Sequence, residues 1–405
     1  MSTIKLSDPL PLPCGATLPN RIAKAAMSEH LGTPKQSPTR GLTRLYERWS
    51  AGGAGLLITG NVMIDSGHLE AVRNVSIRPD SKIERFRDWA AAGAGHGNHV
   101  WMQLNHPGRQ TPRHINPSPG APSVVEPVNL LRRAKIFGTP HAMDEDEIGQ
   151  VIRSFASAAT FAQAAGFTGV QVHGAHGYLI SQFLSPLTNK RTDRWGGPLD
   201  NRARFARTVL GEIRRAVGDD FPVGIKLNSA DFQRGGFTEE ESMRVLQMLQ
   251  QDGVDLVEIS GGSYESRVMM DEAQSDREAF FLEYARKARA EVDIPMMVTG
   301  GFRDRAVMER ALATGALDVV GMARPFTNNP EVARDLIEAR TDRASDPPVM
   351  PGLARLGGMS QAMMSVAQMG LLAKGKSPEL RFGGLSTVFS ALIEEAGSIF
   401  RPKRS

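Results

Sequence analysis

The stretch "DEDEIGQVIRSFASAATFAQAAGFTGVQVHG" (residues 144–174) combines one helix signal with one strand signal. Asp144 and Glu147 have the spacing of a helix N-cap and its capping-box partner, and Gly166 is a typical helix stop signal. The short run "GVQVHG" (169–174) follows almost directly and has the length of a buried strand. The stretch therefore predicts a helix over residues 144–166 and a strand immediately after it.

The same strand–helix alternation continues from near residue 20 to near residue 340. The segment "TEEESMRVLQMLQQDG" places Thr238, Glu241 and Gly253 in the same three helix roles. Most candidate strands are nearly continuous in apolar character, as parallel strands covered by helices are, and they occupy residues 21–27, 55–60, 99–105, 169–174, 222–228, 256–262, 294–300 and 317–324. Eight such units predict an α/β fold, a (β/α)8 TIM barrel. An open doubly wound sheet is the alternative, but it rarely needs eight regular units.

Two features extend this barrel. Residues 106–143 and 175–200 form long loops after the third and fourth strands, where barrels usually build the active site. The chain divides into a barrel over residues 1–340 and a C-terminal helical extension over residues 341–405. Met359 and Met363 have helical spacing in this extension, which predicts packing on the barrel or on a partner subunit.

The composition is that of an ordinary globular chain. Of 405 residues, 41% are hydrophobic and 23% are charged, and the net charge of +4 comes from interleaved acids and bases, which predicts no nucleic-acid partner. Cys14 is the one cysteine, so an intramolecular disulfide and a four-cysteine iron–sulfur cluster are excluded. The start "MSTIKLSDPLPLPCG" has no apolar signal core, and no run approaches the roughly 18 apolar residues of a membrane helix. These features predict a cytoplasmic chain with no membrane partner.

Two glycine-containing motifs follow the last two predicted strands. "TGG" (299–301) ends the seventh strand and "GMARP" (321–325) ends the eighth. Glycine lets backbone N–H groups approach an anion, and Arg324 can bind its oxygens in a bidentate manner. Either motif alone favours a simple turn or a surface arginine, but barrels often bind phosphate between these two loops. The pair therefore favours a phosphate site, while no G-x-G-x-x-G motif follows a strand to indicate a Rossmann domain.

The motif "HGAHGYL" (173–179) places two histidines and a tyrosine at the end of the fourth strand. Two imidazoles three residues apart can bind a metal, but no cysteine is near and no completing carboxylate is evident, so no metal is predicted. Paired histidines can instead donate two hydrogen bonds to one substrate oxygen, and Tyr178 can supply a proton. A purely structural role for these loop residues is the alternative.

Polar residues also end other predicted strands. Gln103 ends the third strand, and Lys226 and Asn228 end the fifth. A buried amide or lysine is costly unless it is paired, and the carbonyl and N–H groups of a flavin edge would pair them. A satisfied core polar group is the alternative for each residue taken alone.

Six longer motifs carry a family resemblance. They are "LPNRIAKAAMSEH" (18–30), "GLLITGN" (55–61), "MQLNHPGRQ" (102–110), "VQVHGAHGYLISQFLSPLTNKRTDRWGGPLDNR" (170–202), "VTGGFRD" (298–304) and "VVGMARPF" (319–326). Over residues 5–340 the chain resembles the old yellow enzyme family of FMN-dependent ene-reductases and NADH:flavin oxidoreductases. The cysteine run of the iron–sulfur members is absent, so the resemblance is to the single-barrel type.

The resemblance implies a noncovalently bound FMN and NADH or NADPH as the reductant. It implies that His173 and His176 bind the oxygen of the substrate and that Tyr178 protonates carbon. His30 stands at a substrate-contacting position of some members. The positions that match the FMN-binding motifs are Ala25, Ala26, Met27, Ser28, Gly60, Asn61, Gln103, Lys226, Gly300, Gly301, Ala323 and Arg324.

Three positions depart from the family pattern. Lys226 stands where many members have arginine, Ser28 where subgroups have cysteine or threonine, and His30 where some have tyrosine. The effect of Lys226 and Ser28 on the redox potential is therefore open. The resemblance implies an ene-reductase that reduces α,β-unsaturated carbonyl or nitro compounds by ping-pong hydride transfer. An NADH oxidase or flavin reductase of the same fold, a flavin-free phosphate-binding lyase or isomerase, and a flavin carrier are alternatives, and a homo-oligomer is left open.

Overall fold

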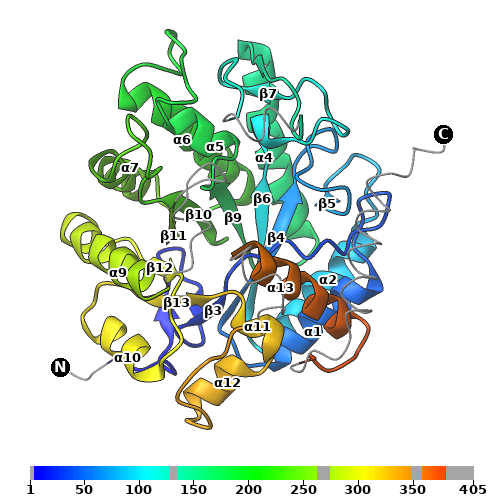
Figure 1. Ribbon diagram of the computed structural model, residues 1–405, viewed down its shortest axis with the longest axis vertical. Helices are drawn as coiled ribbons and strands as arrows, with labels where there is room; N and C mark the ends of the chain where they lie inside the picture. Colours follow the sequence, from blue (N-terminus) through cyan, green and yellow to red (C-terminus); the bar gives the residue numbers. More distant parts are fainter. Residues whose placement is uncertain (1–3, 128–134, 262–273, 348–357, 380–405) are drawn as a thin grey trace.

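The computed structural model describes residues 4–127, 135–261, 274–347 and 358–379 (Figure 1). Eight parallel strands pair in chain order, and the eighth pairs back with the first, which closes the barrel. These strands are β3 (Ile22–Lys24), β4 (Leu56–Met63), β6 (His99–Asn105), β9 (Gly169–Gly174), β10 (Val223–Asn228), β11 (Leu256–Ser260), β12 (Met296–Thr299) and β13 (Val319–Met322). Each overlaps the strand predicted at its place, so the predicted (β/α)8 TIM barrel is confirmed.

Helices cover the outside of this barrel (Figure 1). The longer ones are α1 (Arg40–Ala51), α2 (Ile83–Ala94), α4 (Glu145–Ala164), α6 (Leu199–Val217), α7 (Glu239–Gln251), α9 (Gln274–Glu291) and α10 (Arg305–Ala313). In α1, Leu42, Leu45 and Trp49 recur at intervals of three and four residues and are fully buried. This spacing places them on one face, whose burial stabilises the helix against the strands. No described helix has the length and hydropathy needed to cross a bilayer.

Both predicted capping boxes are present. Asp144 and Glu147 exchange side-chain and backbone hydrogen bonds at the start of α4, and Thr238 and Glu241 do the same at the start of α7. Gly166 follows α4 with φ +87°, a left-handed conformation that favours glycine, as the predicted stop signal requires. These helix ends are therefore decided by local sequence.

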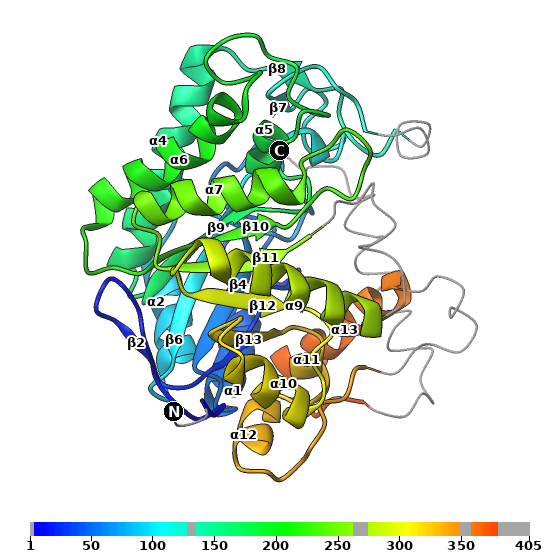
Figure 2. The same cartoon turned by 90° about the vertical axis from the view of Figure 1, so that its left-hand side faces the viewer.

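Several short strands and helices lie outside the barrel strands and the longer helices. They are β1 (Leu10–Pro11), β2 (Thr17–Leu18), β5 (Val75–Ser76), β7 (Gly120–Ala121), β8 (His141–Ala142), the 3-10 turn η1 (Gly108–Gln110), α5 (Leu179–Leu184), α11 (Pro325–Asn328) and α12 (Val332–Ile337). The hairpin of β1 and β2 lies at one end of the barrel (Figure 2). Strands β7 and β8 pair within the long loop after β6.

Apolar side chains fill the barrel interior near that hairpin. Ile58, Trp101 and Met297 come from three different strands and pack in one cluster with Leu10 of β1. A Cβ atom on Gly169 would lie 2.5 Å from the indole of Trp101, so the neighbouring strand needs glycine to make room for this ring. The hairpin end of the barrel is thus a packed core, which leaves the opposite, carboxyl end for a site.

The predicted C-terminal extension contains one described helix, α13 (Gly358–Ala373). It packs against α1 and α11, and Arg44 of α1 donates a 2.9 Å hydrogen bond to the carbonyl oxygen of Ala373. Met369 and Leu372 are buried in this contact. Residues 348–357 and 380–405 of the extension lie outside the described residues. The boundary at residue 340 and any packing on a partner subunit stay predictions.

Candidate active site

A layer of polar side chains lies in the barrel above the apolar cluster. Side chains alternate along a strand, so Gln103 points into the same interior as Trp101 two residues earlier. Gln103 donates to Oε1 of Gln171 at 2.7 Å, and Gln171 donates to Oε2 of Glu258 at 2.8 Å. The Nζ atom of Lys226 lies 2.9 Å from Oε1 of Glu258. All four polar residues are at most 5% exposed, so the network is shielded from solvent.

Two members of this layer are indicated by the sequence and two are not. Gln103 and Lys226 lie at the predicted strand ends, whereas Gln171 and Glu258 were not identified. The available signal was a single polar residue inside an otherwise apolar strand, as in "LVEIS" (256–260). The fully buried carboxylate of Glu258 lies beside the ammonium of Lys226. Lys226 is therefore half of an ion pair and not an isolated cation.

The segment after β3 runs beside an irregular part of β4. A Cβ atom on Gly60 would lie 2.3 Å from the carbonyl oxygen of Met27, so this close approach requires glycine. The pairing of β4 with β6 shifts register between Ile58 and Asn61, which marks a β-bulge. Bulges re-aim side chains next to active sites. His30 shares the wall of a small cavity with Gly60 and Asn61.

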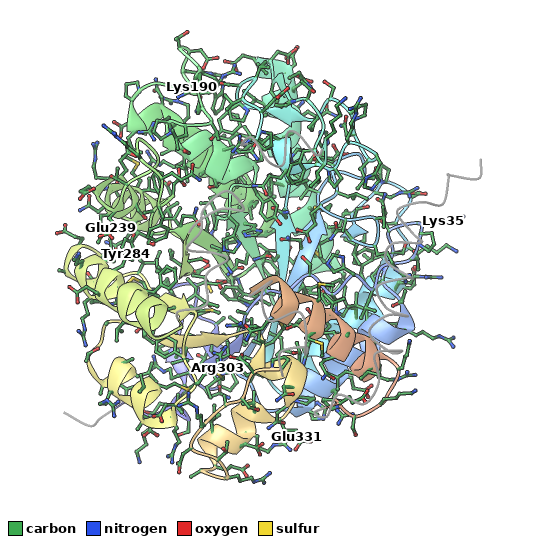
Figure 3. The ribbon with its side chains drawn as sticks, viewed as in Figure 1. Lys35, Lys190, Glu239, Tyr284, Arg303 and Glu331 are labelled. Carbon is green, nitrogen blue, oxygen red and sulfur yellow. The ribbon has the colours of Figure 1, made fainter. Side chains whose placement is uncertain are left out.

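The predicted phosphate loops contain two arginines. Gly300 and Gly301 follow β12 with φ +129° and +81°, conformations that L side chains rarely adopt. Arg324 follows β13, and its Nε lies 3.6 Å from Oδ1 of Asp346. Nη2 of Arg303, labelled in Figure 3, lies 2.6 Å from the same oxygen. Arg303 was not predicted, because an arginine two residues after the glycine pair carries no signal without the fold.

The three residues of the "HGAHGYL" motif lie together at the end of β9. Nδ1 of His173 is 2.9 Å from Oδ1 of Asn61, and Nε2 of His173 is 3.3 Å from Nδ1 of His176. Nε2 of His176 is 2.7 Å from Oγ of Ser260. The ring of Tyr178 meets the ring of His173 edge-on at 4.7 Å between centroids. His176 has φ +60°, a strained conformation for histidine that is typical of functional sites.

Both imidazoles are neutral at physiological pH. Burial lowers the pKa of His173 well below its usual value, and the neighbouring His176 and Lys226 lower it further. Burial and the ammonium of Lys226 lower the pKa of His176 in the same direction. A neutral imidazole carries one N–H group, so the direction of each hydrogen bond in this chain of residues matters.

A carboxylate that the sequence did not indicate completes the site. Oε2 of Glu70 accepts hydrogen bonds from the hydroxyl of Tyr178 at 2.5 Å and from Nδ2 of Asn61 at 2.6 Å. Oε1 of Glu70 accepts from Nδ2 of Asn74 at 3.1 Å and from the hydroxyl of Ser28. Glu70 lies in the loop between β4 and β5, outside any strand or helix, so no periodicity marks it.

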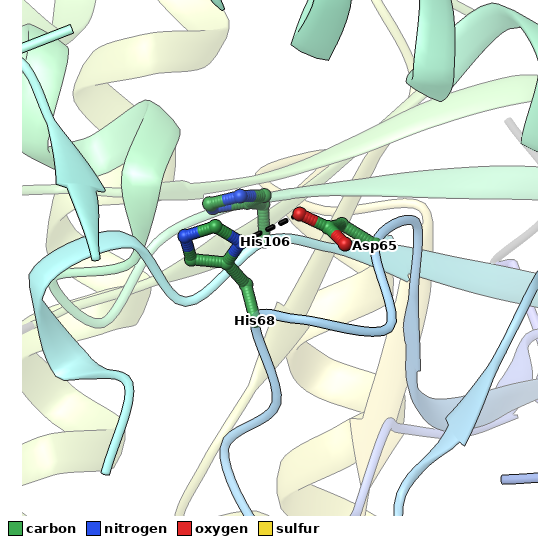
Figure 4. Close-up of side chains that lie close together, drawn as sticks. All are labelled: Asp65, His68 and His106. Carbon is green, nitrogen blue, oxygen red and sulfur yellow. Dashed lines mark hydrogen bonds and ion pairs between the residues drawn. The ribbon is translucent and has the colours of Figure 1, made fainter. Parts of the chain in front are cut away.

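The same loop is anchored by a second cluster, Asp65, His68 and His106 (Figure 4). Nδ1 of His68 lies 2.5 Å from Oδ2 of Asp65, and the rings of His68 and His106 are 4.3 Å apart. One ligand atom from each of the three residues lies within 4.8 Å of the others, a spacing that a metal ion would accept.

The hydrogen bonds of this cluster argue against a metal. Nε2 of His68 accepts the N–H of Gly120 at 3.3 Å, and Nδ1 of His106 accepts the N–H of Gly108 at 3.1 Å. A metal-bound neutral imidazole must carry its hydrogen on the other nitrogen and donate it. Among the described residues, Nε2 of His68 faces two N–H donors, Gly120 and Asn116, and Nδ1 of His106 faces the N–H of Gly108, so the cluster is assigned to holding the loop. The predicted absence of a metal stays a prediction.

Comparison with known proteins places this arrangement in a family. Residues 5–343 match the NADH:flavin oxidoreductase / NADH oxidase family. The chain belongs to this family. The family member NADH-dependent flavin oxidoreductase nadA of Aspergillus parasiticus is 38% identical over 369 residues, which cover 87% of this chain and 82% of that protein. NADH oxidase of Thermoanaerobacter brockii is 34% identical over 325 residues, which cover 79% of this chain and 49% of that protein.

Solved structures agree with this family assignment. A 2-naphthoyl-CoA reductase complex has a TM-score of 0.76 at 28% identity, over 83% of this chain and 52% of that chain. An old yellow enzyme homologue from Zymomonas mobilis has a TM-score of 0.73 at 23% identity, over 85% of this chain and 95% of that chain, which shows the shared fold. The chain thus spans about half the length of the larger relatives. The resemblance to the old yellow enzyme family is confirmed.

FMN is the cofactor of this family, with NAD(P)H as the reductant. The residues present fit an FMN. The glycine pair after β12 and the guanidinium of Arg324 offer phosphate donors. The buried hydroxyl of Thr299 has no hydrogen-bond partner among the described residues, at the end of the same strand. The amide of Gln103 and the ammonium of Lys226 are the donors that a flavin pyrimidine edge requires.

Proposed function

We propose that this flavin oxidoreductase uses NAD(P)H to reduce the activated carbon–carbon double bond of α,β-unsaturated carbonyl or nitro compounds. The observation that supports the proposal is the grouping of two neutral imidazoles with the phenol of Tyr178. Reducing such an alkene requires a hydrogen-bond donor for its activating oxygen and a proton for its α-carbon. His176 and Tyr178 each contact His173, so both kinds of group lie beside that ring.

The role of each residue depends on which of its nitrogen or oxygen atoms carries a hydrogen that it can donate. When bound, FMN would supply the hydride transfer from NAD(P)H to the β-carbon of the substrate. His176 directs its Nδ1 toward His173 in this structure and can turn that N–H to the substrate oxygen, which draws electron density out of the alkene. Tyr178 then protonates the α-carbon, since a tyrosine phenol ordinarily keeps its proton at neutral pH.

We propose that FMN lies across the carboxyl ends of the strands. The segment after β3 and the bulge of β4 would hold its ring system, the polar layer would pair its pyrimidine edge, and the loops after β12 and β13 would bind its phosphate. The residues are those of the family motifs, Ala25, Ala26, Met27, Ser28, Gly60, Asn61, Gln103, Lys226, Gly300, Gly301, Ala323 and Arg324.

Arg324→Ala should weaken FMN binding by about 1.5–3 kcal/mol, the scale of a hydrogen bond to a charged group. FMN affinity is measured by adding FMN back to flavin-free protein and following the quenching of its fluorescence. FMN affinity is measured for Arg303→Ala as well, because Arg303 lies in the other phosphate loop and contacts the same Asp346 oxygen. If Arg324→Ala binds FMN as tightly as the parent, the FMN phosphate does not bind at Arg324.

An NADH oxidase activity is the second candidate, supported by the name of the Thermoanaerobacter brockii relative. NADH consumption under nitrogen, with and without cyclohexenone, separates the two functions. The proposal expects rapid anaerobic consumption that depends on cyclohexenone and falls strongly in the His173→Ala, His176→Ala double variant. Turnover that requires oxygen and ignores cyclohexenone would favour the oxidase. Family membership sets aside a flavin-free lyase or isomerase.

A further inference from the structure

The carboxylate of Glu70 dictates where hydrogens lie in the site. An ionised carboxylate only accepts hydrogen bonds, so every group that contacts it must turn a hydrogen toward it. The phenolic hydrogen of Tyr178 therefore points at Oε2 of Glu70. The amide of Asn61 must likewise present Nδ2 to Glu70, which leaves Oδ1 of Asn61 facing His173.

This amide orientation decides the tautomer of His173. Oδ1 of Asn61 is an acceptor 2.9 Å from Nδ1 of His173, so Nδ1 carries the hydrogen. A neutral His173 then has a bare Nε2, which accepts the Nδ1 hydrogen of His176. Nε2 of His176 in turn accepts the hydroxyl hydrogen of Ser260. Hydrogens thus point in one direction along the chain, from Ser260 to Glu70.

We propose that Glu70 is a positioning residue that fixes the direction of the Tyr178 hydroxyl and the tautomer of His173 before a substrate binds. This inference rests on the proposed function for the roles of those two residues. The histidine pair then offers a substrate oxygen one hydrogen, from His176, and not the two that the paired motif suggests. The carboxylate also places a negative charge beside the oxygen site, so neutral carbonyl and nitro ligands are favoured over phenolates and carboxylates.

The loop that carries Glu70 also has anchors that do not involve this carboxylate. This loop is already held by the hydrogen bond between Asp65 and His68 (Figure 4), and His68 also accepts the N–H of Gly120. Lys226, the cation that acts on both histidines, is itself paired with Glu258. A carboxylate at this place therefore acts on the hydrogens of the site and on its charge.

Glu70→Gln tests the assignment directly. Glutamine keeps the shape of the side chain but can donate to Oδ1 of Asn61, which lets that amide turn its Nδ2 toward His173. The hydrogen of His173 should then move to Nε2. Long-range proton–nitrogen correlation spectra of the histidine side chains, recorded on the FMN-loaded protein, distinguish the two tautomers. Parent protein should show Nδ1–H at His173, identified by its loss in His173→Asn, and Glu70→Gln should show Nε2–H.

Ligand affinity supplies a second readout. Removal of the charge and the gain of a donor should tighten the binding of p-hydroxybenzaldehyde by about tenfold or more, the scale of one charge-assisted hydrogen bond. Affinity is measured from the charge-transfer absorbance of the complex. Glu84→Gln, on the exposed face of α2, is the matched control and should bind like the parent. Unchanged or weaker phenol binding by Glu70→Gln, or an unchanged His173 tautomer, overturns the inference.

Asn61→Ala gives an independent check if Glu70→Gln folds poorly. It removes the acceptor for Nδ1 while Glu70 stays in place, so His173 should lose its preference for Nδ1–H. An Asn61→Ala protein that retains this tautomer contradicts the assignment. None of these measurements needs alkene reduction. A parent protein that does not reduce cyclohexenone, yet shows the expected spectra and phenol affinities, would disprove the proposed function and leave the role of Glu70 intact.

Discussion

Tyr178→Phe is expected to slow reoxidation of the reduced enzyme by cyclohexenone about a hundred- to ten-thousand-fold, the usual cost of removing a positioned general acid. The change deletes the hydroxyl and keeps the ring, which packs edge-on against His173. Reduction of the enzyme by NAD(P)H needs no proton from this side chain, so it should stay near the parental rate. Rapid mixing measures the two half-reactions separately.

Two outcomes would contradict this role for Tyr178. Equal slowing of both half-reactions would mean that the substitution disturbs cofactor placement, and parental reoxidation would mean that another acid or water supplies the proton. Nitroalkenes are the matched control substrates, because they can leave as nitronates without a proton at carbon. Their reduction should therefore be much less affected than that of cyclohexenone.

Glu258→Gln is expected to lower the free energy of unfolding by about 3–5 kcal/mol, the usual cost of breaking a buried ion pair from one side. The substitution leaves the ammonium of Lys226 in the barrel without its counter-charge, at 6% side-chain exposure. Urea unfolding at saturating FMN measures the loss. A Glu258→Gln protein as stable as the parent would show that Lys226 finds another partner.

Two controls separate charge from packing at Glu258. Lys226→Met combined with Glu258→Leu removes both charges, so the double variant should be more stable than Glu258→Gln alone. Glu145→Gln breaks the solvent-exposed pair of Glu145 with Arg194 and should change stability little. A large loss in the exposed variant would mean that ion pairs matter in this protein irrespective of burial.

The barrel was predictable because its signals are local. The capping boxes at Asp144 and Thr238 satisfy backbone N–H groups within one turn, and the left-handed Gly166 ends a helix within two residues. Parallel strands buried on both faces read as short apolar runs whatever their neighbours are. Eight strands closing into a barrel then bring their carboxyl ends to one rim, so residues at those ends were expected to meet.

The candidate site was predictable only where its residues share a motif or a strand end. His173, His176 and Tyr178 stand within six residues of sequence, and their proximity follows from the turn after β9. Glu70 stands 108 positions from Tyr178, and no local pattern links a loop carboxylate to a distant phenol. The role of Glu258 could not be predicted for the same reason, because its pairing with Lys226 depends on the register between β10 and β11.

The sequence by itself determined the eight strand–helix units, the family and the chemical groups at the barrel mouth. Only the tertiary structure decided the state of those groups: that Lys226 is charge-paired, that the imidazoles are neutral, and that Glu70 draws the hydrogen of Tyr178 toward itself. The physical reason is the distance along the chain over which each kind of interaction acts. Helix and strand signals act within a few residues, whereas charge balance and hydrogen-bond direction depend on whichever atoms the fold places within about 3 Å.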